Sequence, residues 1–356
     1  MQNSFLLYGA NGYSGKLIAR FASQYGLQPI LAGRNREAIT VLAQQLQFDY
    51  RIVDLDDAPA LEKVLQEVKL VVHAAGPYDL TAKQMVAACM VTGTHYIDLN
   101  GDLEVFEMMQ GYNQQAKEKN IMLLPGAGFD VVPTDCLSLY LKNKLPAADR
   151  LQISFVILGS GLSRGTSITT LQKLGMPGAS RKQGKIVPEP IGIRGMQVQF
   201  LPGNESSFVM SIPWGDVSTA YFTTGIPNIE TYTGIGKGVW IFLKFQRLFN
   251  WLLRMGFVHR IITKIINSKS PGPDDVRRDN AVSLIRAKVT AADGSTAAAS
   301  MRCPEAYSLT AQTVLLIAKK ILDGQYKPGY QTPASAYGED LIMEIPGVER
   351  HMLNTL

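Results

Sequence analysis

Short apolar runs alternate with amphipathic stretches from the start of the chain to about residue 130. Runs of this length favour buried β-strands, and the stretches between them have the spacing of helices or contain glycine-rich turns. Strands that alternate with helices form parallel sheets, and right-handed crossovers make a doubly wound α/β sheet the simplest topology. The runs that predict its six strands are residues 4–8, 28–32, 50–53, 69–74, 95–99 and 121–124.

The pattern changes after residue 130. A helix is predicted from Pro133 to about Lys144, because proline suits a first helical turn and Asp135 follows closely. Further on, apolar and polar residues alternate, which is typical of half-buried antiparallel strands, and an Asp-Gly turn predicts a hairpin. The alternating stretches are residues 151–158, 196–200, 207–212 and 218–224, and the hairpin joins 281–290 to 295–301.

A chain of 356 residues is long for a single core, so these changes of pattern are read as domain boundaries. Residues 1–130 form the first domain, and residues 131–304 form an inserted, mixed α+β domain. The C-terminal segment, 305–356, begins with an apolar-faced helix over 307–324 and is expected to return to the first domain.

The composition excludes several classes of protein. The chain is 46% hydrophobic and 18% charged, as in folded proteins, and its net charge of +5 is too small to indicate a nucleic-acid partner. Cys89, Cys136 and Cys303 are odd in number and far apart, and the four histidines lack metal-ligand spacing, so neither a disulfide framework nor a metal site is predicted. With no leader or spanning segment visible, a cytoplasmic location is expected.

Three glycines follow the first predicted strand at intervals of three residues and open a helix. Glycine permits a tight turn and lets backbone N–H groups approach a phosphate closely, while the helix N-terminus favours an anion. A glycine triplet is weak evidence alone, but between a strand and a helix it predicts a Rossmann-type dinucleotide site. The predicted cofactor-binding residues here are Gly9, Ala10, Asn11, Gly12, Tyr13, Ser14 and Gly15.

The end of the second predicted strand indicates which dinucleotide binds. An NAD site usually has a carboxylate there, whereas this chain has Gly33, Arg34 and Asn35, with Arg36 as a second basic candidate. A guanidinium suits the 2′-phosphate of NADP, so NADP is the predicted cofactor and Arg34 its selector. Asp54, at the end of the third strand, is expected to face the adenine, although a helix-capping role would give the same pattern.

Three further turns converge on the same edge of the sheet, because ligands of such sheets sit beyond the carboxyl ends of the strands. Small residues after the fourth strand leave room for a nicotinamide ring. Tyr78, Asp98 and Asp130 are the candidate catalytic residues, since they are the nearest groups able to bond a substrate or move a proton. Each also has a structural alternative, as a turn cap or a packed tyrosine. The small residues are Ala75, Gly76 and Pro77.

The order of several motifs resembles the saccharopine dehydrogenase-like oxidoreductases, particularly the branch that includes trans-acting enoyl reductases. The resemblance implies an NADP-binding Rossmann domain with an inserted catalytic or dimerisation domain, and reduction of an enoyl thioester or lipid-like substrate. Arg164 stands where the family often has a glycine. The motifs are "GANGYSG", "AAGPY", "GTHYIDLNGD", "PGAGFDVVPTD", "SRGTSITTL", "GPDDVRRDN", "CPEAYSLTA" and "TPASAYGEDLI".

The expected function is therefore NADPH-dependent hydride transfer to an activated double bond, in a homodimer. An imine reductase of the saccharopine type is the alternative chemistry, and it would need a basic cluster such as Arg164, Arg181 and Lys182 to bind substrate carboxylates. A non-catalytic NADP-binding scaffold at a membrane is the alternative class, because no acid–base pair is obvious in the sequence.

Residues 237–266 contain no acid and place apolar and basic residues on different sides of a helix. That composition is typical of a helix lying in the interface of an anionic membrane. Packing against its own domain or a dimer partner is the alternative, so a peripheral membrane contact stands as a hypothesis.

Overall fold

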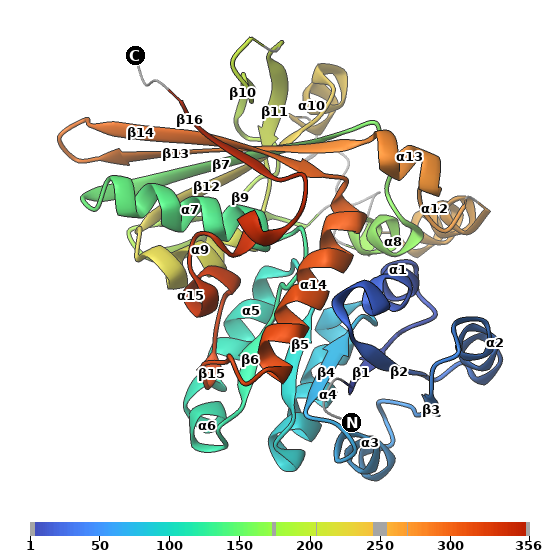
Figure 1. Cartoon of the computed structure of the whole chain (residues 1–356). Coiled ribbons are helices and arrows are strands. Elements are labelled where there is room, and N and C mark those ends of the chain that lie inside the picture. Colours follow the sequence, from blue (N-terminus) through green and yellow to red (C-terminus); the bar gives the residue numbers. More distant parts are fainter. Residues whose placement is uncertain (1–3, 173–175, 204, 245–254, 269, 354–356) are drawn as a thin grey trace. The chain divides into compact units, whose positions relative to one another are not determined.

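The computed structural model (Figure 1) describes residues 4–172, 176–203, 205–244, 255–268 and 270–353. The chain forms two units, and each contains its own β-sheet. Unit 1 comprises Met1–Val132 and Tyr307–Ala336, and unit 2 comprises Pro133–Ala306 and Tyr337–Leu356.

The sheet of unit 1 has seven strands in the order β15-β6-β5-β4-β1-β2-β3, and its neighbouring strands are parallel. This confirms the predicted doubly wound sheet, and all six predicted strands are present. The strand order reverses between β1 and β4, where ligands of such sheets bind. The strands are β1 (Ser4–Tyr8), β2 (Gln28–Gly33), β3 (Tyr50–Ile52), β4 (Leu70–His73), β5 (His95–Asp98), β6 (Met122–Leu124) and β15 (Gly329–Tyr330).

Helices connect these strands, as parallel neighbours require. Gly12 precedes the first helix, and Asn35 and Asp57 cap the second and third through their side chains. The helices are α1 (Tyr13–Phe21), η1 (Ala22–Tyr25), α2 (Arg36–Leu46), α3 (Ala58–Leu65), α4 (Tyr78–Thr92), α5 (Leu103–Gln110), α6 (Asn113–Glu118) and α14 (Ala306–Leu322).

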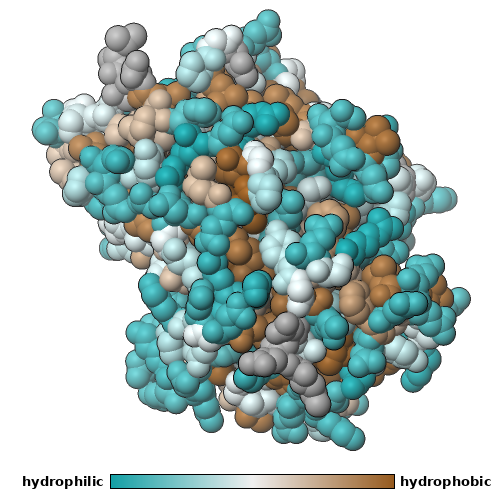
Figure 2. Space-filling model, in the orientation of Figure 1, coloured by the Kyte–Doolittle hydropathy of each residue, from teal (hydrophilic) through white to brown (hydrophobic). Residues whose placement is uncertain are grey.

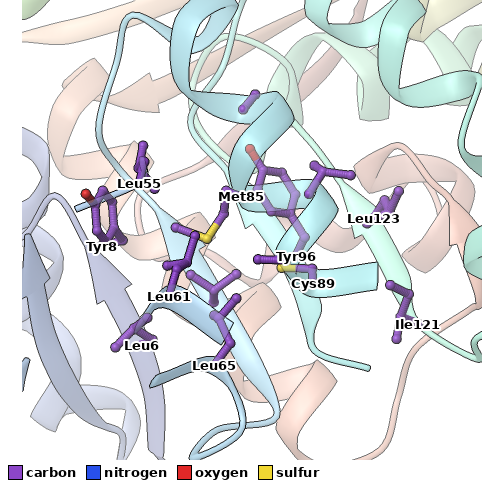
Figure 3. Close-up of a cluster of buried hydrophobic side chains, with 14 of the residues drawn as sticks. Leu6, Tyr8, Leu55, Leu61, Leu65, Met85, Cys89, Tyr96, Ile121 and Leu123 are labelled. Atoms are coloured by element: carbon purple, nitrogen blue, oxygen red, sulfur yellow. The ribbon is translucent and has the colours of Figure 1, made fainter. Parts of the chain in front are cut away.

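The apolar residues of the strands and of the helices that cover them form the core of unit 1 (Figure 3). Leu6 of β1 and Leu123 of β6 are fully buried, as are Leu61 of α3 and Met85 of α4. Each such side chain contributes about 1.5–3 kcal/mol relative to exposure, so burial on both faces holds the strand ends in fixed positions.

Unit 2 contains a mixed sheet in the order β10-β11-β12-β7-β13-β14-β16, with β8 and β9 attached beside β12. The predicted hairpin is present as β13 and β14. The stretch 151–158 was predicted to be antiparallel, but β7 is antiparallel only to β13 and parallel to β12. The strands are β7 (Ala148–Leu158), β8 (Gly178–Lys182), β9 (Lys185–Glu189), β10 (Gly195–Val198), β11 (Ser207–Ser211), β12 (Asn228–Gly234), β13 (Val282–Ala291), β14 (Thr296–Pro304) and β16 (Glu349–Leu353).

One stretch predicted to be a strand, 218–224, is helical. Gly215 precedes this helix, Asp216 lies in its first turn, and Gly225 ends it in the left-handed conformation. Asp216 to Ala220 are all buried in succession, so the burial does not alternate as it would in a half-buried strand. Helix α15 (Pro333–Tyr337) belongs to unit 1 except for its last residue. The helices of unit 2 are α7 (Val132–Lys144), α8 (Arg164–Gln172), α9 (Asp216–Thr224), α10 (Lys237–Lys244), α12 (Gly256–Ser268), α13 (Asp275–Asn280) and η2 (Leu341–Glu344).

The C-terminal segment divides between the units. Helix α14 and strand β15 belong to unit 1, where β15 extends the parallel sheet beside β6. Strand β16 instead pairs with β14 in unit 2, so the expectation that all of 305–356 returns to the first domain is wrong for its last residues. An edge strand has backbone N–H and C=O groups without a partner strand. Strand β16 pairs with these groups of β14 over Ala298–Arg302.

No helix of the described residues combines the length and apolarity needed to cross a membrane. Within the predicted amphipathic stretch 237–266, the structure describes α10 and most of α12. Residues 245–254, including Trp251, lie outside the described residues.

Candidate cofactor and active site

The turn after β1 is packed so closely that only glycine fits at two of its positions. Gly9 has a φ of +86°, and a Cβ built on it would lie 2.7 Å from the carbonyl carbon of Ala74. A Cβ on Gly15 would collide with the carbonyl oxygen of Gly9. The amides of Gly9 and Ala10 both donate to the carbonyl of Ala32, at 2.8 and 3.2 Å. The turn is thus held against the ends of β2 and β4.

Helix α1 begins directly after this turn without a side-chain cap. Gly12 is the N-cap residue and makes no side-chain hydrogen bond, and the amide of Lys16 donates to its carbonyl at 2.9 Å. The N–H groups of a first helical turn have no partner inside the helix, so they suit an external anion. Tyr13 is oriented by Tyr307 of α14, whose ring packs edge-on at 4.9 Å. Ser14, in the same turn, is half-buried.

The end of β2 presents the basic side chain that the sequence singled out. Arg34 is exposed, whereas Gly33 is buried beside the side chains of Ile39 and Asn11. The side chain of Asn35 accepts a hydrogen bond from the amide of Ala38 at 3.0 Å, so this carbonyl oxygen caps α2.

The pKa of Tyr8, at the end of β1, depends on the charges around it. Burial raises the pKa of its phenol to about 12, Asp54 adds to the rise, and Arg34 opposes it. The phenol donates to the carbonyl of Val53 at 3.2 Å. Arg34 and Asp54 therefore act on the same buried group, at the edge where the first three strands end. Asp54 is exposed and accepts from the amide of Asp56 at 3.2 Å, so it also stabilises its own turn.

A groove of about 300 Å³ runs beside this edge. It is lined by Lys16 of α1, by Asn35 and by residues along α2 from Glu37 to Gln45. Lys16 is exposed and was missed by the sequence reasoning, which stopped at the last glycine. A lysine one position after a phosphate-binding glycine was the signal that could have identified it.

The turn after β4 lies against the glycine turn. A Cβ on Gly9 would come within 2.8 Å of the Cβ of Ala75, so these two predicted segments are in contact. Thr81 fixes the conformation of the β4 turn, because its hydroxyl donates to the carbonyls of Ala75 at 2.8 Å and Pro77 at 3.0 Å. Gly76 is exposed between them.

Tyr78 begins α4 and is half-buried at this turn. Its hydroxyl donates to the carbonyl of His73 at 3.3 Å, and the two rings meet edge-on. Burial raises the pKa of Tyr78 well above its usual value of 10, and the charges of Asp98, Asp130 and Asp102 add to the rise. The phenol therefore stays protonated at neutral pH, as a hydrogen-bond donor.

Asp98 connects the turns after β5 and β6. Its fully buried carboxylate accepts hydrogen bonds from the Tyr96 hydroxyl at 2.7 Å, the Asn100 amide at 2.9 Å and the Gly126 amide at 2.8 Å. Its backbone carbonyl also accepts from the amide of Ala127 at 2.7 Å. Burial raises the pKa of Asp98 to about 6, despite these hydrogen bonds. The carboxylate therefore holds the turn after β5 and the turn after β6 together.

Asp130 is half-buried on the turn after β6, and its side chain lies against Gly101. A Cβ at Gly101 would come within 2.6 Å of an Asp130 carboxylate oxygen, so only glycine admits this approach. The structure thus brings Tyr78, Asp98 and Asp130 to one edge of unit 1. It adds Asp102, which is buried and was not a candidate from the sequence.

The basic residues proposed for binding a substrate carboxylate do not form a free cluster in unit 2. The guanidinium of Arg181 is buried, donates to the carbonyls of Val217 at 2.6 Å and Gly184 at 2.7 Å, and stacks on Tyr221. Lys182 forms an ion pair with Glu189. Two of the three expected cations therefore already bond to groups within unit 2.

The family model described as the saccharopine dehydrogenase NADP-binding domain matches residues 5–124. A saccharopine dehydrogenase-like oxidoreductase of Mus musculus is 27% identical over 202 residues, which cover 50% of this chain and 47% of the mouse protein. A Mycobacterium tuberculosis protein named as a trans-acting enoyl reductase is 29% identical over 182 residues, covering 48% of this chain and 43% of that protein. The chain thus spans about half the length of these relatives.

A solved structure shows the same fold along the whole chain. Saccharopine dehydrogenase (L-Glu forming) from Saccharomyces cerevisiae superposes with a TM-score of 0.69, over 99% of this chain and 100% of the yeast chain, at 16% identity. Residues 5–124 therefore form an NADP-binding domain of the saccharopine dehydrogenase type, and the resemblance of the chain to saccharopine dehydrogenase-like oxidoreductases is confirmed.

Proposed function

We propose that this protein is an NADPH-dependent reductase that reduces the C=C bond of an enoyl thioester or a lipid-like substrate. The observation that carries the proposal is the turn over Gly9–Gly15, where close packing leaves backbone donors at the uncapped start of α1. The name of the mycobacterial relative supports the choice of an enoyl substrate over other acceptors.

Each part of the cofactor has a matching group in unit 1. The amides at the start of α1 would bind the diphosphate, and the exposed Arg34 would bind the 2′-phosphate. Ala75 contacts the glycine turn at Gly9, and Gly76 follows it. These two small residues would leave space for the nicotinamide ring. Bound NADPH supplies the hydride, and the residues of the chain hold the reacting atoms in position.

Reduction of an enoyl thioester adds a hydride to the β-carbon and a proton to the α-carbon. Tyr78 is the proposed source of that proton, directly or through water, because its hydroxyl lies at the correct edge of the sheet. Asp98 is proposed as a positioning residue, since its oxygens are already bonded to Tyr96 and to the turns. Asp130 is the other group that could exchange a proton with the substrate.

The proposal is tested by following NADPH oxidation with enoyl-CoA, keto and imine substrates. We expect turnover with enoyl-CoA, and we expect Tyr78→Phe to lower kcat by about 10²- to 10³-fold, because a general acid contributes in that range. NADPH affinity should be unchanged in this variant. Tight NADPH binding without turnover of any substrate would contradict the proposal and favour the non-catalytic scaffold.

Imine reduction gains no support from the arrangement of Arg181 and Lys182, which are bonded within unit 2. If imines alone were turned over, the enoyl assignment would be wrong. The homodimer and the cytoplasmic location inferred from the sequence stay predictions, and sedimentation of the purified chain measures the first of them.

A further inference from the structure

An apolar stripe is exposed along α12 of unit 2. Phe257, Ile261 and Ile265 are 45%, 55% and 51% exposed. Residues four positions apart project from the same side of a helix, so these three side chains form one continuous row. The face drawn in Figure 2 is mainly hydrophilic, with apolar residues in small groups, so a row of large apolar side chains needs an explanation.

The packing of α12 within its own unit uses other residues. The helix lies against α8, and Val258, Ile262 and Ile266 are half-buried. These residues are shifted by one position from the exposed row, and therefore lie on the adjoining side of the helix. Among the described residues, packing on its own domain thus involves the side of α12 that holds Val258, Ile262 and Ile266, and leaves the row about half exposed.

The charged residues of α12 that are exposed beside the row are both basic. Arg260 and Lys264 are exposed and each precedes a residue of the row, so their side chains border it. The segment 237–273 contains no Asp or Glu, and its charge of +7 exceeds the +5 of the whole chain, leaving −2 for the remainder. The net positive charge of the protein is therefore concentrated here. The basic residues are Lys237, Lys244, Arg247, Arg254, Arg260, Lys264 and Lys269.

Helix α10, earlier in the same segment, is held differently. The indole of Trp240 donates to the carbonyl of Gly192 at 2.7 Å, and its ring packs on Phe208 at 4.9 Å. Trp240 therefore anchors α10 to unit 2. For this reason the surface is assigned to α12 and not to α10.

We infer that the exposed row of α12, with its bordering cations, is a docking surface for an anionic lipid bilayer. An interfacial helix buries one apolar side among the acyl chains and directs cations at the head groups, and α12 has both features. A second copy of the chain is a poorer partner, because it would bring the same positive segment to the contact. Crossing the bilayer is not involved, as no described helix is long and apolar enough.

Co-sedimentation of the full chain with vesicles tests the inference. We expect binding to vesicles of equal parts phosphatidylglycerol and phosphatidylcholine, weakened by salt, and much less binding to phosphatidylcholine alone. The triple variant Phe257→Ser, Ile261→Ser, Ile265→Ser should lower the partition coefficient by about tenfold or more. The double variant Arg260→Gln, Lys264→Gln should lower it by about 30-fold, since each cation contributes about 1 kcal/mol near such a surface.

Val276→Ser is the matched control. Val276 is 70% exposed on α13 of the same unit, but it follows Asp274 and Asp275, so its removal should leave vesicle binding unchanged. NADPH affinity and circular dichroism verify that each variant is folded. If the triple variant fails to fold, the double variant still tests the inference.

Three results would overturn it. The first is no binding of the wild-type chain to anionic vesicles, and the second is binding by the triple and double variants that equals binding by the wild type. The third is a dimer in the absence of lipid that dissociates in the triple variant, which would assign the row to a second copy. This test does not measure NADPH turnover. A failure of the membrane inference can therefore be distinguished from a failure of the proposed function.

Discussion

Arg34 and its neighbours at the end of β2 have different tasks. The side chain of Asn35 caps α2, and Gly33 is buried against Ile39, whereas Arg34 is exposed and acts electrostatically on the nearby Tyr8. No carboxylate in the strand end itself competes for a ribose hydroxyl. We therefore expect the selectivity for a 2′-phosphate to depend, at this scale, on the guanidinium of Arg34.

Arg34→Ala should weaken NADPH binding by about 10- to 100-fold, because a charge-assisted hydrogen bond to phosphate contributes about 1.5–3 kcal/mol. NADH, which lacks that phosphate, should lose less than about twofold. Calorimetric titration measures both affinities. Arg36→Ala, also exposed and two residues away, tests the second basic candidate and should weaken NADPH binding less than Arg34→Ala does. An equal loss of NADPH and NADH affinity in Arg34→Ala would contradict the assignment of Arg34 to the 2′-phosphate.

At the scale of elements, turns rather than strands form the site, and buried polar groups hold the turns. Asp98 receives two backbone amides and one phenol, and it thereby joins the segments after β5 and β6. His73, at the end of β4, is fully buried, and its Nε2 is 3.0 Å from the Thr81 hydroxyl. Burial raises the pKa of Asp98 to about 6 and lowers the pKa of His73 to about 3.

Asp98→Asn should remove one pH dependence of stability. With its pKa raised from 3.8 to about 6, Asp98 keeps in the native state a proton that the unfolded chain loses between about pH 4 and pH 6. Its contribution is therefore fully present below about pH 4 and is lost as pH rises through about 6. The free energy of unfolding of wild type, relative to that of the variant, should fall by about 1 kcal/mol from pH 5 to pH 7.

Urea unfolding of both proteins at each pH measures this difference. The comparison with the variant is needed because His73 acts in the opposite sense. Its lowered pKa gives a contribution that is present above about pH 6.5 and is lost as pH falls towards 3. Parallel pH profiles for wild type and Asp98→Asn would show that Asp98 titrates alike in the folded and unfolded chain.

At the scale of the whole molecule, the residues proposed to bind the cofactor all belong to unit 1. The glycine turn, Arg34, Asp54 and the β4 turn lie within Met1–Val132, and α14, which packs on Tyr13 through Tyr307, belongs to the same unit. Unit 2 has its own sheet and its own core around Phe200 and Tyr232. Cofactor binding should therefore stabilise unit 1 more than unit 2.

NADPH at about 100 times its dissociation constant should slow hydrogen exchange of the amides in β1 and β4 by up to about 100-fold, which corresponds to about 2.7 kcal/mol. Amides of β7 and β13 should be slowed much less, if they exchange through opening of unit 2 alone. Exchange measured by mass spectrometry, with NADH as the control ligand, reports both regions. Equal slowing in the two sheets would mean that the units open together.

The sequence by itself determined the features that depend on local pattern. Buried parallel strands read as short apolar runs, so all six strands of the first domain could be located, and glycine spacing placed the turn after β1. The hairpin of β13 and β14 followed from its Asp-Gly turn. In each case the signal lies within about ten residues and the physical cause is local.

Only the tertiary structure decided which distant residues meet and what each polar group does there. It paired β16 with β14, made 218–224 a helix, and turned Trp240 inwards, because the partners of these segments lie far away in the sequence. It also added Asp102 to the group around Tyr78 and engaged Arg181 with backbone carbonyls. Burial and long-range hydrogen bonding set these roles, and neither is encoded in the spacing of residues along the chain.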